Sequence, residues 1–402
     1  MSISLGQKLQ ELAVFRNLAK DPVIDAFFVL IRSSERQESM ESVRAKFCEF
    51  AGLLYEAGYT DWTEYLRDKV LCQETCCSAF AGKDHEIPSY MLDAAMNELA
   101  TLSQAGALNS EYFFDDPLMP MFSAHEIDLQ GEYLNRLMHI SEYGFGMFAE
   151  YRMFRIEKGS EDEEVRIRPI AYPDPVTFND LFDYQRQHEE VIENSMVLLE
   201  NQPASNILLY GDAGTGKSAT VKATVNLLAP KGLRLIEIRK NQLELLPELL
   251  EKLSVNPLKF IIFIDDLSFQ ENDDDFSALK AVLEGTVSAR SDNTVIYATS
   301  NRRHIVRESF SERAGDDVHR NDTMQETISL SDRFGLRILF EKPTIKEYRD
   351  IVLSLAKVYG ITMDEDQLIL KAEQFALRKS GRSARAARQF IEQLAVKQER
   401  NS

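Results

Sequence analysis

The stretch "LLYGDAGTGKSATVKA", residues 208–223, restricts the possible fold of this chain more than any other feature. It places three glycines, a lysine and a serine between an apolar run and a run with helical spacing. Glycines allow the backbone to form a nest whose N–H groups face phosphate oxygens, and the helix that follows directs its positive dipole end at the same oxygens. The pattern G-x-x-x-x-G-K-[ST] therefore predicts a strand–loop–helix unit that binds a nucleoside triphosphate.

Within this loop, Lys217 can neutralise the β- and γ-phosphates, and Ser218 can ligate Mg²⁺. The alternative is a glycine-rich turn with an exposed lysine, but the position between a predicted strand and a predicted helix favours phosphate binding. No N-K-x-D guanine motif occurs, so we expect ATP and Mg²⁺ as cofactors. The residues expected to surround the phosphates are Gly211, Asp212, Ala213, Gly214, Thr215, Gly216, Lys217, Ser218 and Ala219.

A second apolar run, "KFIIFIDDLSF" at residues 259–269, ends in two aspartates. Asp265 is expected to hold Mg²⁺ through water, beside the phosphate loop. Asp266 is the candidate for orienting and deprotonating the attacking water. Nucleotide hydrolases of this kind usually carry the longer glutamate there, so hydrolysis by this chain could be slow. The alternative for both residues is an acidic strand end with solvated carboxylates.

The chain divides by pattern into a helical domain at residues 1–145, a β-hairpin and linker at 146–172, an alternating segment at 173–343 and a helical segment at 344–402. The hairpin is predicted from two alternating stretches around "EKGSEDEE". In the third segment, apolar runs alternate with helical runs, which is typical of a parallel sheet covered on both faces by helices.

The first 145 residues carry no chemical signature. The spacing of Leu5, Leu9, Leu12 and Phe15 predicts an amphipathic helix. Five aromatic residues are most simply core, with a partner-binding face as the alternative: Phe27, Phe28, Tyr55, Trp62 and Tyr65. No second ligand pair at zinc-finger spacing accompanies the four cysteines, so we expect reduced and mostly buried thiols rather than a metal site; they are Cys48, Cys72, Cys76 and Cys77.

Several further stretches resemble AAA+ ATPases. "TVIYATSN", residues 294–301, resembles the strand that ends in a polar sensor, which implies that Asn301 reports the γ-phosphate. "SLSDRFGLRILF", residues 329–340, resembles the segment that delivers an arginine finger to the neighbouring subunit, with Arg333 as the match. The alternative for Asn301 is an asparagine in a turn. For Arg333 the alternatives are a local ion pair with Asp332 and a helix end.

The helix start in "GRSARAARQFIEQLA", residues 381–395, resembles the AAA+ lid that carries a second sensor arginine. Arg385 is the first candidate and Arg382 the second, while Arg388 is simply solvated in the alternative reading. The entry segment from Pro173 resembles the AAA+ segment whose backbone, here Leu181 to Tyr184, borders the adenine. Two aromatics in this segment are equally well explained as core, namely Phe178 and Phe182.

From about Pro173 to about Leu394 the chain resembles a family of bacterial AAA+ ATPases catalogued as a domain of unknown function. The resemblance implies that the paired aspartates are typical of this family and not a defect of this chain. The resemblance implies an α/β P-loop AAA+ sheet between helices, with a helical lid at 344–402 after the nucleotide-binding domain and a helical N-terminal domain before it. It also implies a homo-oligomeric ring, such as a hexamer.

The net charge of −19 argues against a protein that coats nucleic acid or anionic membranes, and no apolar run is long enough to span a membrane. The N-terminus does not resemble a secretion signal, and a cytoplasmic location is expected. We therefore predict an ATPase that couples hydrolysis to remodelling or moving a macromolecular partner, an unidentified protein or nucleic acid. The alternative is a nucleotide-gated switch or adaptor with slow turnover. A small-molecule kinase is disfavoured because no acceptor site is apparent.

One segment, residues 302–326, matches no part of such an ATPase. It is long and mixed in charge, and segments of this length are often functional or disordered. Three arginines in it can contact a polymer or a neighbouring subunit, the alternative being a solvated surface loop: Arg302, Arg303 and Arg307.

Overall fold

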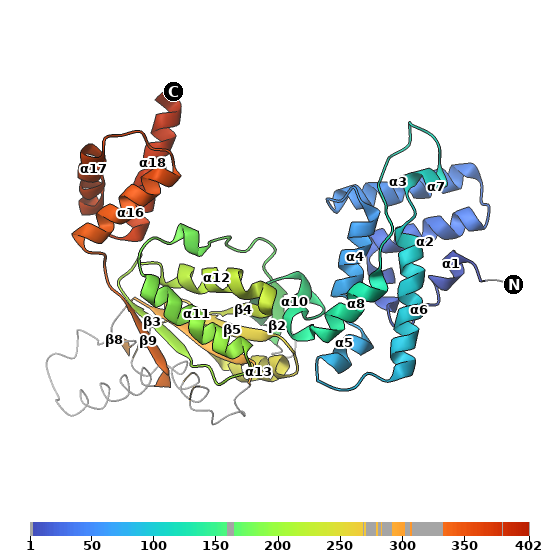
Figure 1. Ribbon diagram of the computed structural model, residues 1–402, viewed down its shortest axis with the longest axis horizontal. Coiled ribbons are helices and arrows are strands. Elements are labelled where there is room, and N and C mark those ends of the chain that lie inside the picture. The colour runs from blue at the N-terminus through green and yellow to red at the C-terminus, as the bar shows by residue number, and fades with distance from the viewer. Residues whose placement is uncertain are drawn as a thin grey trace. The chain divides into compact units, whose positions relative to one another are not determined.

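The computed structural model describes residues 3–158, 165–267, 269–270, 279, 283, 292–301, 306–307, 333–379 and 381–401. Asp332 and most of the 302–326 segment, including Arg302 and Arg303, lie outside these residues. The chain divides into two compact units, Met1–Glu150 and Tyr151–Ser402 (Figure 1). The finer boundaries expected at residues 145, 172 and 343 stay predictions.

The first unit consists of helices, as expected. Polar residues with non-helical backbones precede several of them and accept hydrogen bonds from the first helical turn, as Asp21, Ser39 and Asp61 do. The helices are α1 (Leu5–Lys8), η1 (Arg16–Lys20), α2 (Pro22–Glu35), α3 (Met40–Glu56), α4 (Trp62–Cys72), α5 (Cys76–Ala81), α6 (Ser89–Gly106), α7 (Ser110–Phe113), α8 (Leu129–Met138), α9 (Ile140–Tyr143) and α10 (Met147–Glu150).

The predicted amphipathic helix at the N-terminus is wrong, because α1 ends at Lys8. The carboxylate of Glu98 accepts hydrogen bonds from the backbone N–H groups of Ala13, Val14 and Phe15 at 2.8–3.1 Å, and these bonds hold an irregular backbone there. Leu9, Leu12 and Phe15 are nevertheless buried. The apolar spacing therefore correctly predicted the burial of these side chains but incorrectly predicted a helix.

The aromatic residues of this unit form its core, with one exception. The rings of Phe27 and Trp62 lie 4.1 Å apart between centroids, and Phe28 and Tyr65 are also buried. Tyr55 is 42% exposed, and its hydroxyl donates to the carbonyl of Met121, so the core assignment is wrong for Tyr55.

The expectation of mostly buried thiols is also wrong. Cys77 alone of the four cysteines is fully buried, Cys72 is half-buried, and Cys48 and Cys76 are exposed. Over the part of the chain that the structure describes, no group of three or more His, Cys, Asp and Glu side chains is placed to hold a metal ion.

The second unit is built on a seven-stranded sheet in the order β2-β1-β4-β5-β7-β3-β9. Every neighbouring pair in it is parallel except β1 and β2. Its strands are β1 (Met153–Lys158), β2 (Val165–Pro169), β3 (Ile207–Gly211), β4 (Leu233–Ile238), β5 (Lys259–Ile264), β7 (Thr294–Ser300) and β9 (Leu336–Phe340). A separate pair is formed by β6 (Phe269–Gln270) and β8 (Val306–Arg307).

The predicted hairpin is confirmed as β1 and β2, and it is continuous with the main sheet. Met153 to Arg155 of β1 pair in parallel with Leu235 to Glu237 of β4. The hairpin therefore adds two strands to one edge of the α/β sheet instead of standing apart from it.

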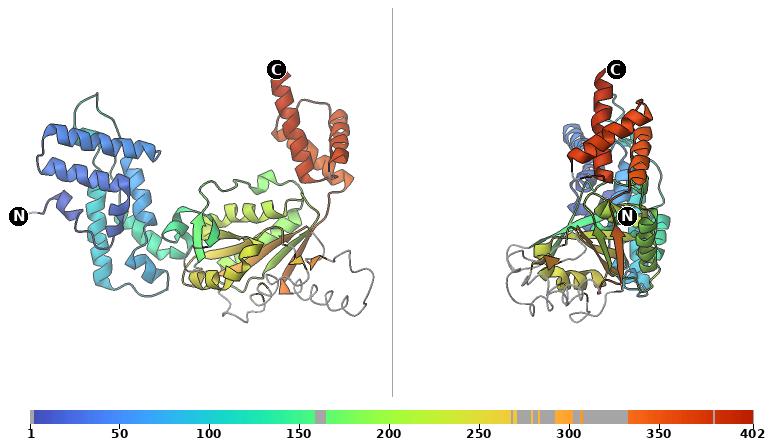
Figure 2. Two further views of the ribbon diagram at one scale, coloured as in Figure 1. Left: turned by 180° about the vertical axis from the view of Figure 1, so that it is seen from behind. Right: turned by 90° about the vertical axis from the view of Figure 1, so that its left-hand side faces the viewer.

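Side chains alternate between the two faces along each strand, so the apolar strands present apolar side chains on both faces. Helices cover both of these faces. One face, with Leu209, Phe263 and Tyr297, packs against α11 (Gln185–Leu199) and α12 (Lys217–Leu228). On the opposite face lies the amphipathic helix α13 (Leu246–Ser254), as the end-on view in Figure 2 shows. Short 3-10 turns η2 (Phe178–Asp180), η3 (Ala229–Lys231) and η4 (Lys240–Leu245) connect these elements.

After β9, the helices α16 (Ile345–Val358), α17 (Glu365–Arg378) and α18 (Ala384–Asn401) form a small bundle with its own apolar core. Fully buried residues such as Val352, Ala372 and Ile391 pack together in it. The predicted α/β fold class is confirmed: a mostly parallel sheet lies between helices and is followed by a C-terminal helical bundle, here called the lid, while the N-terminal unit is helical (Figure 1). Among the described residues, no helix has an apolar stretch sufficient to span a bilayer.

Candidate nucleotide-binding site

The phosphate loop joins the end of β3 at Gly211 to the start of α12 at Lys217. Gly211, Gly214 and Gly216 all have positive φ angles, of 127°, 78° and 96°. A Cβ atom on Gly211 would lie 2.2 Å from the carbonyl oxygen of Phe340 in the neighbouring strand β9, so glycine is required there. The loop therefore has the left-handed backbone and close packing that its glycines predicted.

Lys217 is 5% exposed and lies across the concave side of the loop. Its Nζ donates to the carbonyl oxygens of Asp212 at 2.6 Å and Gly211 at 3.3 Å, and to Oδ1 of Asn301 at 3.0 Å. Burial lowers the pKa of Lys217, while the carboxylates of Asp212, Asp265 and Asp266 act in the opposite direction and favour the charged form. The side-chain amine of Lys217 thus lies within the loop that would surround the phosphates.

The two predicted metal ligands lie together at the carboxyl edge of the sheet. Ser218 Oγ donates to Asp265 Oδ1 at 2.6 Å. A hydroxyl and a carboxylate are oxygen ligands of the kind that Mg²⁺ prefers. The side chains of Ser218 and Asp265 therefore lie together, and their binding of Mg²⁺, through water in the case of Asp265, stays a prediction.

Thr299 is a residue of this site that the sequence reasoning missed. Its Oγ1 donates to Asp265 Oδ1 at 2.5 Å and accepts from the backbone N–H of Asp266 at 2.9 Å. Its side chain thus connects the two aspartates, although it belongs to a different strand, β7. The polar end of "TVIYATSN" could have revealed it. Thr299 and Asn301 are two residues apart, so a continued strand would place both side chains on the same face of the sheet.

Asp266 and Asn301 contact each other, and Asn301 also contacts Lys217. Asn301 Nδ2 donates to Asp266 Oδ1 at 2.8 Å, while its Oδ1 accepts from Lys217. Asp266 has a left-handed backbone with φ of 52°, which its N–H bond to Thr299 helps to hold. The carboxamide of Asn301 therefore bridges Lys217, the candidate phosphate-binding residue, and Asp266, the candidate base.

We expect Thr299→Val to lower ATP hydrolysis about tenfold while ATP affinity changes little, because both aspartates lose the hydroxyl that positions them. Initial rates of phosphate release and calorimetric ATP titrations would measure the two effects. Thr224→Val is the matched control, since Thr224 is fully buried in α12 and its hydroxyl donates to a carbonyl of its own helix. A Thr299→Val rate equal to that of the wild type would contradict the assignment.

The three arginines considered for the second sensor have different surroundings. The backbone N–H of Arg385 donates to the carbonyl oxygen of Gly214 at 3.2 Å, so α18 begins against the phosphate loop. Arg382 instead pairs with Glu373 within the lid at 2.9 Å, and this carboxylate raises the pKa of Arg382. Arg388 donates to the carbonyl of Asp180 and is not simply solvated. Arg385 thus remains the first candidate, and its role stays a prediction.

Arg333 lies away from the phosphate loop of its own chain. In the parallel pair of β3 and β9, Gly211 is opposite Phe340 and Ile207 is opposite Leu336. Arg333 precedes Leu336, the first residue of β9, and the nearby Gly335 lies against Ser205, which precedes β3. The role of Arg333 stays a prediction.

The segment expected to border the adenine has an unusual backbone. Asp183 and Tyr184 adopt positive φ angles of 77° and 65°. The ring of Phe178 lies 5.1 Å from that of His188, whose pKa burial lowers to about 4, and Phe182 packs against the core of the lid. Both phenylalanines are thus packed against neighbours, and the contact of this backbone with adenine stays a prediction.

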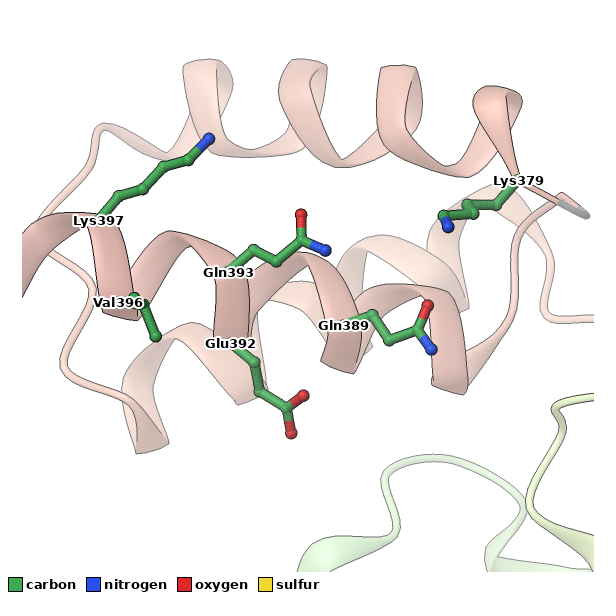
Figure 3. Close-up of a pocket in the computed structure, with 6 residues that line it drawn as sticks. All are labelled: Lys379, Gln389, Glu392, Gln393, Val396 and Lys397. Carbon is green, nitrogen blue, oxygen red and sulfur yellow. The ribbon is translucent and has the colours of Figure 1, made fainter.

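A separate groove of about 610 Å³ opens on the lid, away from these residues. Figure 3 shows Lys379, at the end of α17, facing the side chains of α18 that line the groove. These are Gln389, Glu392, Gln393, Val396 and Lys397. None of them belongs to the phosphate site, so the groove is not the expected place for the nucleotide.

Comparison with known proteins gave one family and several solved structures. The family described as "Protein of unknown function (DUF815)" matches residues 149–398. No curated protein matches the chain. Among solved structures, the Thermotoga maritima RuvB Holliday junction branch migration motor is similar at 11% identity and a TM-score of 0.35, over 54% of this chain and 63% of that one.

A mutant form of Thermotoga maritima RuvB is similar at 12% identity and a TM-score of 0.37, over 54% of this chain and 64% of that one. The chain therefore spans less than two thirds of the length of these proteins. Similarity at this level says nothing about what the present chain binds or does.

Proposed function

This chain belongs to the DUF815 family, and from that starting point we propose that it is an AAA+ ATPase that binds ATP with Mg²⁺ and hydrolyses it. The observation that carries the proposal is the chain of hydrogen bonds that links Lys217, Asn301 and Asp266. These residues come from α12 and from the ends of β7 and β5, and their side chains meet at one edge of the sheet. Phosphoryl transfer needs a cation, a polar sensor and a carboxylate in such proximity.

In this proposal, each side chain of the site has one role in binding or hydrolysing ATP. The loop N–H groups and Lys217 hold the phosphates, and Asn301 orients the reacting end. Asp266 accepts a proton from the attacking water. Ser218 and Asp265 would hold Mg²⁺, which neutralises charge on the phosphate oxygens when bound. Thr299 keeps both aspartates in position through its two hydrogen bonds.

We further propose that the chain works as a homo-oligomer, in which Arg333 completes the site of a neighbouring subunit. Its position before the amino end of β9 supports this, because the phosphate loop follows the opposite, carboxyl end of the neighbouring strand β3. In such a ring, the lid that contacts Gly214 would move with the nucleotide and drive a macromolecular partner. The partner is a protein or a nucleic acid, and the oligomer is proposed to be cytoplasmic.

Asp266→Asn tests this proposal most directly. Asparagine cannot accept the proton, so we expect hydrolysis to fall about 100-fold while ATP binding persists. Phosphate release and calorimetry would be measured on the purified chain. Asp292→Asn is a matched control, because Asp292 is an exposed carboxylate just before the amino end of β7. If Asp266→Asn hydrolyses ATP as fast as the wild type, Asp266 is not the base.

One observation favours a second function, a nucleotide-gated switch with slow turnover. The candidate base is the short side chain of Asp266, and its carboxylate already accepts a hydrogen bond from Asn301. A wild-type chain that binds ATP tightly but turns it over no faster with DNA or cell extract would support the switch. The Asp266→Asn protein, which is expected to bind ATP without cleaving it, would then retain its partners in a pull-down only when ATP is present.

A further inference from the structure

Asp212 makes contacts on two sides of the phosphate loop. On one side, its carbonyl oxygen accepts the shortest hydrogen bond that Lys217 Nζ makes, at 2.6 Å. On the other side, its carboxylate Oδ2 accepts from the backbone N–H of Lys342 at 3.0 Å, and its own N–H donates to Phe340 at 2.9 Å. One loop residue therefore touches both the lysine that would bind phosphate and the chain beyond β9.

The chain beyond β9 is the connection to the lid. Strand β9 ends at Phe340 and α16 begins at Ile345, so residues 341–344, here called the lid hinge, contain the N–H group that Asp212 binds. The hydroxyl of Tyr184 donates to the carbonyl of Glu341 at 2.5 Å. The lid hinge is thus held at two adjacent residues, and one of these two bonds comes from the phosphate loop itself.

The lid also contacts the same loop directly. The N–H of Arg385 donates to Gly214, and a Cβ atom at Gly214 would lie 3.2 Å from Ser383 Oγ and 3.3 Å from Arg385 Cβ. Because Gly214 and Asp212 are two residues apart, a change in the loop backbone alters both the hydrogen bond to Lys342 and the hydrogen bond to Arg385. The loop therefore has one hydrogen bond to the lid hinge, at Asp212, and one to the start of α18, at Gly214.

We propose that Asp212 is a positioning residue that couples the phosphate loop to the lid through its hydrogen bond to Lys342. This inference rests on the proposed ATP binding. An ammonium group has three N–H donors, and Lys217 has three oxygen acceptors within the site. A phosphate oxygen that binds Lys217 must displace at least one of them. Release of the Asp212 carbonyl changes the backbone at Asp212, and its carboxylate transmits the change to the lid hinge.

The test compares Asp212→Ala, Asp212→Asn and the wild type by hydrogen–deuterium exchange with and without ATP and Mg²⁺. In the wild type, ATP is expected to change exchange about threefold or more in peptides covering residues 341–346 and 383–387. Asp212→Ala removes the acceptor and should abolish this change. Asp212→Asn retains an acceptor oxygen and should restore it. Hydrolysis by Asp212→Ala should show kcat reduced about tenfold with KM nearly unchanged.

The control is Thr344→Ala, which removes the hydroxyl that caps α16 at Glu347 but leaves Asp212 intact. It should keep the ATP-dependent exchange. The proposal is overturned if Asp212→Ala keeps the change or if Asp212→Asn fails to restore it. Calorimetric titration of the wild type with ATP distinguishes a failure of this proposal from a failure of the proposed function. If the wild-type chain does not bind ATP, the proposed function itself is refuted.

Discussion

Lys217→Ala is expected to weaken ATP binding about 100-fold and to reduce hydrolysis below detection. Hydrogen bonds from a charged donor contribute about 1.5–3 kcal/mol each, and alanine leaves the phosphates with only the loop N–H groups. Lys217→Ala also removes the three hydrogen bonds that Nζ donates, so we expect a modest fall in thermal stability. Calorimetric titration with ATP and thermal unfolding of both proteins would measure the two expectations.

Lys222→Ala is the control for Lys217→Ala. Lys222 lies in the same helix α12 and faces Asp174 at 3.7 Å, away from the residues of the phosphate site. It should bind ATP as the wild type does. Equal ATP affinity in Lys217→Ala and the wild type would remove the basis for the nucleotide site and for every proposal built on it.

Arg333→Ala is expected to lower hydrolysis about 1000-fold, the range known for arginine fingers, with ATP affinity unchanged. The reason is geometric, since Arg333 precedes the amino end of β9 while the phosphate loop follows the carboxyl end of β3, and in the proposed oligomer Arg333 acts on a neighbouring subunit's ATP. Phosphate release, calorimetry and the oligomeric state at each concentration would be measured. Arg337→Ala, at an exposed position of the same strand, is the control.

Mixing two inactive proteins tests the same idea more sharply. Arg333→Ala subunits keep an intact ATP site, and Lys217→Ala subunits keep Arg333. In an equal mixture, half of the subunits have the ATP site and half of their neighbours supply the arginine, so about a quarter of wild-type activity should return. No recovery in mixed oligomers, or full activity of dilute wild-type monomers, would contradict a role between subunits.

Much of the site could be predicted from the sequence because its parts are local. The order strand, glycine loop, lysine, helix lies within residues 207–228, and the φ angles of its glycines follow from the pattern. Asp265 and Asp266 likewise directly follow the buried strand β5. Parallel strands bring their carboxyl ends to one edge, so the meeting of these residues with Asn301 was also predictable.

Other features could not be predicted, for a physical reason that they share. Thr299 connects the two aspartates only because β7 lies between β5 and β3, and the packing of both sheet faces decides that order. The irregular N-terminus depends on Glu98, far along the chain. Such contacts join distant residues and leave no periodic pattern in either segment.

The sequence by itself determined the phosphate loop, the alternation of strands and helices, and the paired aspartates, since each is set by neighbours along the chain. Only the tertiary structure decided that the β1–β2 hairpin extends the main sheet, that Arg333 lies at the far end of β9, and that Asp212 binds the lid hinge at Lys342. These depend on which strands pair and where the lid packs, and burial of apolar surface from the whole unit selects those arrangements.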